Sequence, residues 1–122
     1  MKRIGIAMMG LILCACEGGK VQPRALSGAD AGLGRNITER VGCGACHQIP
    51  GVTWPQGKVG PSLEGFADRA LIAGRFPNQP ETLARFVRDA PSLSPETGMP
   101  PMPLTEEEAR HVAAYLYTLH AR

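Results

Sequence analysis

One short segment, Cys43-Gly44-Ala45-Cys46-His47, has residue types and a spacing suited to covalent chemistry. Two thiols three positions apart lie on one turn, where each can add to a vinyl group of the same haem and form a thioether. The adjacent histidine is then carried under the haem iron as an axial ligand. The segment therefore predicts one covalently attached haem c, with Cys43 and Cys46 bonded to the ring and His47 bound to iron.

Two other uses of a paired-cysteine segment fit the chain less well. A thioredoxin-like dithiol requires a βαβ context, and no such pattern is visible. A structural zinc site needs about four ligands, but no second cysteine pair follows in the body of the chain, which adds only His111 and His120. The composition also favours a bound cofactor. The chain has 15 glycines and 11 prolines, which indicate many loops, and its 6 aromatic residues are few with which to fill a core.

The first residues have the pattern of an export signal. Lys2 and Arg3 precede an apolar stretch over 4–15, which is too short to span a bilayer. Leu13-Cys14-Ala15-Cys16 resembles a bacterial lipobox, which predicts cleavage before Cys16 and acylation of that residue. The alternative is an ordinary signal peptide cut nearby. We expect a signal over 1–15, a flexible tether over 16–28 and a folded domain over 29–122.

Removal of the signal changes the charge balance of the chain. The full sequence has 13 basic and 11 acidic residues, and loss of Lys2 and Arg3 leaves 11 of each. A near-neutral domain does not suit a protein that binds nucleic acid by neutralising phosphates. We therefore expect no nucleic-acid partner. From the signal and the lipobox we expect an exported monomer on the periplasmic side with a lipid anchor through Cys16.

The pattern of apolar residues predicts a small all-α domain of three to five short helices around one haem. Leu33, Ile37 and Val41 recur every four residues in a helix that starts near residue 29 and ends at Gly42. A brief helical turn is expected over 63–69, and a helix begins near 78–81, where a proline is tolerated in the first turn. Its apolar face is Leu83, Phe86, Val87 and Ala90.

The last third of the chain divides into a stiff loop and a final helix. Residues 91–104 hold five prolines and two methionines, which predicts that Pro91 stops the preceding helix and that the loop contains none. Thr105 and Glu108 have the spacing of a capping box. The helix that follows presents an apolar face of Ala109, Val112, Ala113, Leu116 and Leu119, while His111 and His120 are expected to face solvent.

Residues 34–119 resemble the class I, or mitochondrial-type, monohaem cytochromes c. The likeness is strongest to small bacterial cytochromes c and to the cytochrome domain fused to some cytochrome oxidase subunits II. It rests on the haem motif, on Gly34-Arg35-Asn36-Ile37 as the first-helix segment, and on Tyr115 as the aromatic residue of the last helix. The resemblance implies that these two helices cross closely, with Gly34 allowing the backbones to approach.

The resemblance also implies roles for residues around the haem. Gly60-Pro61-Ser62-Leu63 matches the family's Gly-Pro-x-Leu, in which the carbonyl of Pro61 accepts a hydrogen bond from His47 Nδ1–H and makes the ring a better ligand. Arg69 falls where relatives often place an arginine near a haem propionate. Phe86 replaces a tryptophan that binds a propionate in relatives, so Arg69 or Arg75 is expected to compensate.

The sixth iron ligand is implied by Thr97-Gly98-Met99-Pro100, which resembles the family's Met-Pro segment. Met99 is the expected thioether ligand, and such a ligand favours ferrous iron. Met102 is the rival, although it also suits a role as core filler. Coordination by two histidines is the weaker alternative.

These features predict an electron carrier, and not an enzyme, because both axial positions of the iron are filled. The resemblance implies respiratory partners: a quinol–cytochrome c reductase, a haem-copper oxidase or a dehydrogenase. Two alternatives stay open. One is a ligand-binding haem module, such as a gas sensor or a peroxidase-like enzyme, with a displaceable methionine. The other is a fixed haem subunit of a larger oxidoreductase complex.

Overall fold

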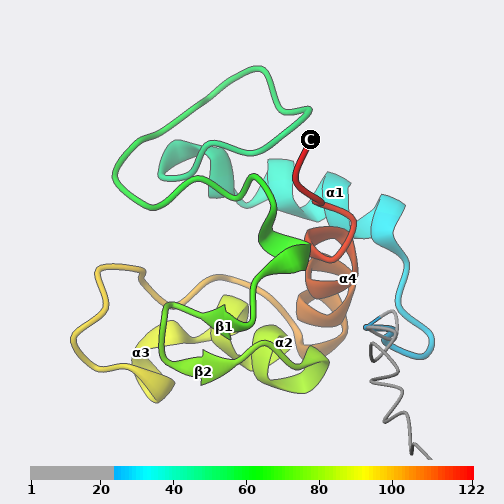
Figure 1. Cartoon of the computed structure of the whole chain (residues 1–122), viewed down its shortest axis with the longest axis vertical. Helices are drawn as coiled ribbons and strands as arrows, with labels where there is room; N and C mark the ends of the chain where they lie inside the picture. Colours follow the sequence, from blue (N-terminus) through cyan, green and yellow to red (C-terminus); the bar gives the residue numbers. More distant parts are fainter. Residues whose placement is uncertain (1–23) are drawn as a thin grey trace, which may run out of the picture.

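The computed structural model describes residues 24–122, so the predicted signal, Cys16 and most of the predicted tether lie outside it. Figure 1 shows short helices joined by long loops and a small hairpin. No helix among the described residues is long and apolar enough to cross a membrane. The elements in chain order are α1 (Ala31–Arg40), η1 (Cys43–Ala45), η2 (Phe66–Asp68), β1 (Leu71–Ile72), β2 (Phe76–Pro77), α2 (Pro80–Arg88), α3 (Ala90–Leu93) and α4 (Glu106–Leu116).

Helix α1 forms where a helix was predicted. Asp30 caps its first turn by accepting a hydrogen bond from the N–H of Leu33, at 2.7 Å. The buried residues are Gly34 and Thr38, whereas Leu33 is half exposed. Ile37 and Val41 of the predicted repeat are partly buried against the core, and the fully buried positions are the smaller residues where α1 meets α4.

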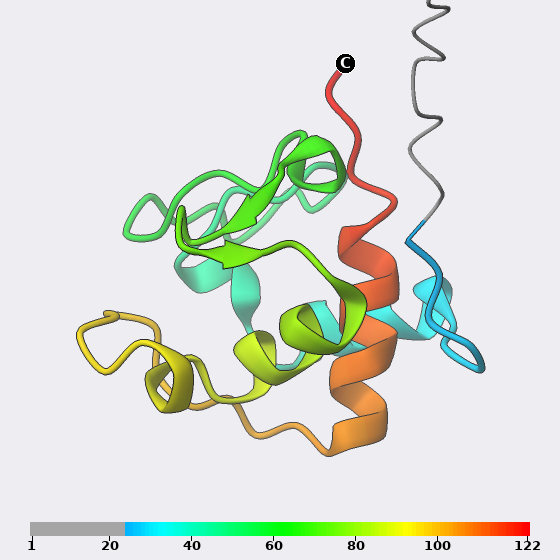
Figure 2. The same cartoon turned by 60° about the horizontal axis from the view of Figure 1, so that its bottom comes forward.

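Helices α1 and α4 cross in close contact at Gly34, as the family resemblance implied (Figure 2). A Cβ at position 34 would lie 1.9 Å from the carbonyl oxygen of His111 and 2.9 Å from the Cβ of Tyr115. Only glycine therefore permits this backbone approach. The crossing brings the start of the domain against its last helix.

Helix α2 carries three members of the predicted apolar face, Leu83, Phe86 and Val87, which are buried. Ala90, predicted as the fourth member, is also buried but is the first residue of α3. The expectation of a helix-free segment after Pro91 was wrong. Helix α2 ends at Arg88, and a short helix α3 follows, with Pro91 in its first turn and Asp89 as its cap. A proline in a first turn costs no hydrogen bond, since the N–H there has no partner within the helix.

Helix α4 has the predicted capping box. Thr105 Oγ1 accepts from the N–H of Glu108, and a Glu108 carboxylate oxygen accepts from the N–H of Thr105. All members of the predicted apolar face are buried, but α4 ends at Leu116, so the last of them, Leu119, lies beyond the helix. His111 corrects one expectation, because it is buried and accepts a hydrogen bond from the backbone N–H of Asp30 instead of facing solvent. His120 is exposed, as expected.

The sequence did not predict the hairpin of β1 and β2, in which Leu71 pairs with Pro77 and Ile72 with Phe76. Two residues in each strand are too few to give a visible alternating pattern. Ile72 of β1 is buried, and the ring centroids of Phe76 and Phe86 lie 6.1 Å apart. The domain is thus mainly helical, with one minimal sheet.

Residues 24–28, which fall in the predicted tether, lie against the domain. Leu26 is buried, and Arg24 donates a hydrogen bond to the carbonyl of Ala67 at 2.6 Å while its guanidinium lies over the ring of Tyr117. The carbonyl of Ser27 accepts from Arg110. The chain is therefore held to the domain from Arg24 onward.

Candidate haem-attachment site

The cysteine segment forms a single turn directly after α1. Gly42 adopts a left-handed conformation, with φ of 80°, that turns the chain out of the helix. The N–H groups of Cys46 and His47 then donate to the carbonyl of Cys43 at 3.2 and 3.0 Å. Cys43 is half-buried and Cys46 exposed, and neither is in a disulfide. Burial raises the pKa of the Cys43 thiol to about 11, so that thiol is neutral at physiological pH.

The ring of His47 is fixed by a contact with the following loop. Its Nδ1 lies 2.7 Å from the carbonyl oxygen of Pro61. A carbonyl oxygen only accepts, so Nδ1 carries the proton and donates it. In the neutral form of the ring this proton stays on Nδ1, so the lone pair of Nε2 is available to a metal. This is the contact that the family resemblance implied for these two residues.

The loop after the motif folds back over it and leaves no room for a side chain at Gly57 or Gly60. The N–H groups of Gly57 and Gly60 donate to the carbonyls of Gly44 and Cys46, both at 2.8 Å. A Cβ at Gly60 would lie 2.5 Å from Cε1 and 2.7 Å from Nδ1 of His47. The backbone of Gly60 therefore packs directly against the imidazole and restrains its orientation.

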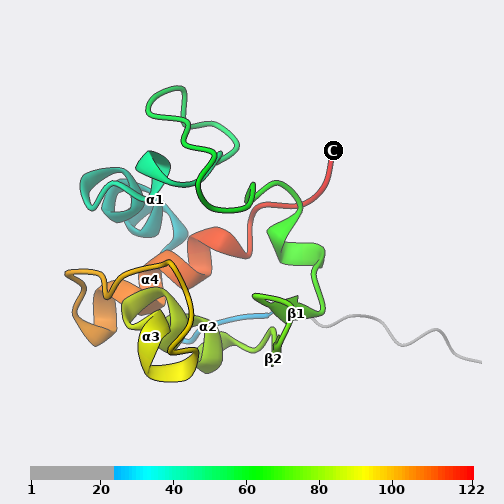
Figure 3. The same ribbon diagram turned by 90° about the vertical axis from the view of Figure 1, so that its left-hand side faces the viewer.

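The two candidate methionine ligands lie on the loop between α3 and α4. Both are half-buried against the core. The N–H of Met99 donates to Thr97 Oγ1 at 3.2 Å, whereas the N–H of Met102 donates to the carbonyl of Arg88 at 2.9 Å, at the end of α2. Figures 2 and 3 show that this loop and the loop over 48–60 extend to the same side of α4.

Arg69 lies against the segment that holds His47. Its Nη2 donates to the carbonyls of Ser62 and Glu64 at 2.6 and 3.1 Å, and its guanidinium lies over the ring of Phe66. Arg75, the other expected propionate partner, forms an ion pair with Glu96 at 2.8 Å. The hydrogen bond from Arg75 holds the pKa of the Glu96 carboxyl below its usual value.

Sequence reasoning missed Asn78, which positions the backbone at Arg69. Asn78 is 1% exposed, and its Nδ2 donates to the carbonyl of Arg69 at 3.0 Å. Its Oδ1 accepts from the hydroxyl of Tyr117 on the C-terminal side of α4, at 3.0 Å. Burial raises the pKa of Tyr117 to about 12 and keeps this donor protonated. The only sequence signal at Asn78 was that of a helix start.

Residues 29–116 match the family described as cytochrome c oxidase, cbb3-type, subunit III. The chain belongs to this cytochrome c family. A protein named cytochrome c oxidase subunit 2, from Alkalihalophilus pseudofirmus, is 34% identical over 90 residues. That region is 73% of this chain and 25% of the relative, so the chain spans about a quarter of the length of that protein.

Membership of this cytochrome c family identifies the cofactor as one covalently attached haem c and the domain as an electron-transfer module. The residues present fit that group. Haem c requires two thiols for the ring and a histidine nitrogen for the iron. Cys43 and Cys46 are free on one turn, and the Nδ1 contact of His47 leaves its Nε2 for a metal. Gly60 packs against the ring of His47. Among residues 24–122, no group of three or more His, Cys, Asp or Glu side chains is arranged to bind a metal ion by itself.

Proposed function

We propose that this cytochrome c domain is a single-electron carrier in which Cys43 and Cys46 hold the haem through thioethers and His47 and Met99 bind the iron. The contact of His47 Nδ1–H with the carbonyl of Pro61 carries the proposal. It fixes the tautomer that directs Nε2 toward a metal and makes the imidazole more basic. The bound haem supplies a one-electron couple between ferric and ferrous iron.

The surroundings of the two methionines support Met99 over Met102 as the sixth ligand. Met102 is held to the end of α2 by its backbone and lines a groove together with Arg85, Arg88 and Asp89. Met99 has no such bond to α2, and its N–H is instead turned to Thr97 within the loop. Pro100 and Pro101 directly after Met99 reduce the freedom of the loop before the sulfur binds. Arg69 is the proposed neighbour of a haem propionate.

We propose that the domain works on the periplasmic side of a membrane, anchored by a lipid on Cys16. With both axial positions filled, the protein has no place for a substrate and is a carrier without enzymatic activity. Its partners would be a quinol–cytochrome c reductase or a dehydrogenase as donor and a haem-copper oxidase as acceptor. Tethering raises the effective concentration of the domain near such membrane partners.

The comparisons also favour a second candidate function, a fixed haem subunit of an oxidase complex. The family is described as a subunit of a cbb3-type oxidase, and the relative is named as an oxidase subunit. Copurification from detergent-solubilised membranes separates the two candidates. A fixed subunit stays with the oxidase through gel filtration, whereas a carrier elutes alone.

The ligand assignment is tested by the optical spectrum of the ferric holoprotein beside Met99→Ala and Met102→Ala. The weak far-red charge-transfer band reports sulfur bound to ferric iron. We expect the band in the wild type and in Met102→Ala and its loss in Met99→Ala. A wild type that lacks the band and binds carbon monoxide readily when reduced would contradict the carrier function and favour the ligand-binding module.

The anchor is tested separately by Cys16→Ser. We expect the wild-type protein in the membrane fraction. Mass spectrometry of the N-terminal peptide should find no lipid on the variant, whether or not its signal is cleaved. An unmodified Cys16 in the wild type would contradict the lipid anchor and favour the ordinary signal peptide.

A further inference from the structure

The chain enters the described domain through residues 24–28, which we call the strap. Arg24 fastens the beginning of the strap, because its guanidinium donates to the carbonyl of Ala67 at 2.6 Å. The Cζ atom of the same guanidinium lies over the ring of Tyr117, 5.6 Å from the ring centroid. A cation over an aromatic face is attracted by the electrons of the ring. Arg24 is therefore held by two elements that are distant from it in the sequence.

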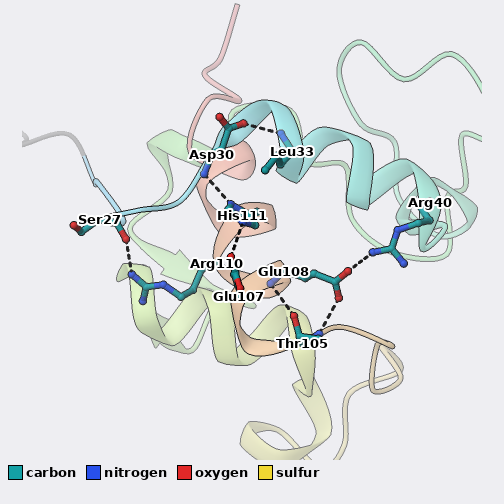
Figure 4. A network of polar contacts seen from close by, with 9 residues as sticks. All are labelled: Ser27, Asp30, Leu33, Arg40, Thr105, Glu107, Glu108, Arg110 and His111. Atoms are coloured by element: carbon teal, nitrogen blue, oxygen red, sulfur yellow. Dashed lines mark hydrogen bonds and ion pairs between the residues drawn. The ribbon is translucent and has the colours of Figure 1, made fainter.

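Two further contacts fasten the rest of the strap. Leu26 is 7% exposed and belongs to the hydrophobic core. The carbonyl of Ser27 accepts a hydrogen bond from Arg110 of α4 at 3.1 Å, as Figure 4 shows. Burial of a leucine side chain stabilises this arrangement by about 1.5–3 kcal/mol relative to leaving it exposed. The strap is therefore part of the folded domain.

The strap determines how much chain connects Cys16 to the domain. Residues 17–23 alone separate Cys16 from Arg24, and an extended chain spans at most about 3.6 Å per residue, so the two residues lie at most about 29 Å apart. Without the strap the connection would run as far as Asp30 and reach about 50 Å. A domain of this size has a radius of gyration of about 13 Å, which corresponds to a sphere roughly 34 Å across. The strap thus makes the connection shorter than the domain is wide.

The strap and the loops around the proposed haem position lie on opposite sides of α4. In Figures 1 and 2 the strap, in blue, lies to the right of α4, and the loop between α3 and α4 lies to its left. If a bilayer touched the side that carries this loop, Arg24 would be about one domain width away from it. A connection of at most about 29 Å cannot cover that distance and also pass around the domain.

We propose that the strap, together with Tyr117 and Arg110 beside it, forms the membrane-proximal face of the domain and lies toward the lipid headgroups. This proposal rests on the proposed lipid anchor at Cys16 and adds the orientation that the anchor imposes. The short connection brings this face to the bilayer, and the guanidinium of Arg24 and the amphipathic ring of Tyr117 suit the hydrated headgroup region.

This orientation determines the height at which electrons are exchanged. The loops around the proposed haem position are turned away from the bilayer and lie on the far side of the domain. An electron partner in the same membrane therefore has to extend its own redox centre above the headgroups to reach them. A partner whose redox centre lies at the level of the headgroups is excluded by the short connection.

The test measures how near two sites lie to the bilayer in mature, lipidated holoprotein on phosphatidylcholine vesicles. Ala25→Cys places a nitroxide spin label on the strap and Val59→Cys places one on the loop over 48–60, at two exposed positions. In the mature protein the haem and the lipid occupy the native thiols, so only the introduced cysteine is labelled. The haem is reduced, because ferrous iron with both axial ligands is diamagnetic.

A lipid with chelated gadolinium in its headgroup serves as the probe, because gadolinium speeds the relaxation of nearby spin labels. The same lipid with chelated lutetium is the diamagnetic control. We expect gadolinium to raise the relaxation rate of the Ala25→Cys label several-fold more than that of the Val59→Cys label. Equal effects at the two sites, or a larger effect at Val59→Cys, would overturn the membrane-proximal face.

A longer connection shows whether its length causes the orientation. An insertion of about twelve glycine and serine residues after Lys20 raises the reach of the connection to about 70 Å, which exceeds the width of the domain. We expect the difference between the two labels to shrink several-fold in this protein, whose folded part is unchanged. Arg24→Ala combined with Leu26→Ser should act in the same direction by releasing the strap. A full difference in the insertion protein would assign the orientation to lipid binding by the domain itself and overturn the proposal.

Failure of the anchor and failure of the orientation give different results. A holoprotein that does not float with the vesicles, like the Cys16→Ser control, contradicts the lipid anchor and with it the orientation. A holoprotein that floats with the vesicles but whose two labels respond equally retains the anchor and overturns only the membrane-proximal face.

Discussion

The backbone N–H of Asp30 donates a hydrogen bond to Nδ1 of His111, and the two atoms lie 2.8 Å apart (Figure 4). Asp30 is also the N-cap of α1, so a residue of α4 holds the capping residue of α1 in place. Glu107 lies 3.8 Å from Nε2 of the same ring. One buried imidazole therefore connects the start of the domain to its last helix.

Replacement of His111 by phenylalanine should destabilise the domain. The ring would keep its volume but leave the N–H of Asp30 without its acceptor, which costs about 1–3 kcal/mol of unfolding free energy. Urea unfolding followed by far-UV circular dichroism measures the loss. His120→Phe is the control and should change the free energy by less than about 0.5 kcal/mol, since that side chain is exposed. Equal losses in the two variants would contradict the role of His111.

Replacement of Gly34 by alanine should be more damaging than any surface change. The new Cβ would overlap the carbonyl of His111, so α1 and α4 would have to separate. We expect a loss of about 3 kcal/mol or more in unfolding free energy, or no soluble holoprotein. Gly32→Ala is the control, because a Cβ there meets no backbone atom and only one side-chain atom, the Asp30 carboxylate oxygen at 3.1 Å, and its effect should stay within about 1 kcal/mol. A Gly34→Ala protein as stable as this control would contradict the close crossing.

The sequence was sufficient where local chemistry decides the structure. The capping box at Thr105 and Glu108 and the turn of the haem motif depend on neighbours in the chain, and both appear as predicted. The buried face of α1 depends instead on α4, so the apolar residue Leu33 is half exposed while Thr38 is buried. His111 and Asn78 were missed because their partners lie far away in the sequence, at Asp30 and at Arg69 and Tyr117.

Glu108 should make the stability of the domain depend on acid pH. The N–H of Thr105 and the guanidinium of Arg40 hold the pKa of this carboxyl below its usual value of 4.5 (Figure 4). Because the pKa of this carboxyl is lower in the folded than in the unfolded protein, its ionised form stabilises the fold at pH values above the unfolded-state pKa. This stabilisation is lost as the pH falls through the folded-state pKa. We therefore expect stability that is constant near neutrality and falls below about pH 4.5.

The variant Glu108→Gln isolates this effect, because glutamine keeps the capping geometry without the charge. Its stability should be lower at neutral pH and should fall less steeply in acid, as measured by urea unfolding at a series of pH values. Glu64→Gln is the control, since the hydrogen bond that Glu64 accepts from Arg69 goes to its backbone carbonyl. Identical acid slopes in the wild type and Glu108→Gln would contradict the assignment.

Asn78→Ala should destabilise the region around Arg69. The change leaves the Tyr117 hydroxyl and the carbonyl of Arg69 without their partner in a buried site, so we expect a loss of about 2–4 kcal/mol. Tyr117→Phe removes only one of these hydrogen bonds and should cost less. Thermal unfolding of both variants measures the difference, and a larger loss in Tyr117→Phe would place the main contribution at the tyrosine instead.

The last prediction concerns Gly60, whose backbone lies against the ring of His47. In Gly60→Ala the added Cβ would lie within 3 Å of three ring atoms, so the imidazole must shift and weaken its bond to the carbonyl of Pro61. A weaker bond makes Nε2 a poorer donor, which favours ferrous iron. If His47 is the axial ligand, potentiometric titration should therefore show a higher midpoint potential in Gly60→Ala than in the wild type. Gly32→Ala, which lies on α1, should leave the potential unchanged. An unchanged potential in a fully haem-loaded Gly60→Ala protein would show that the ring orientation does not tune the iron.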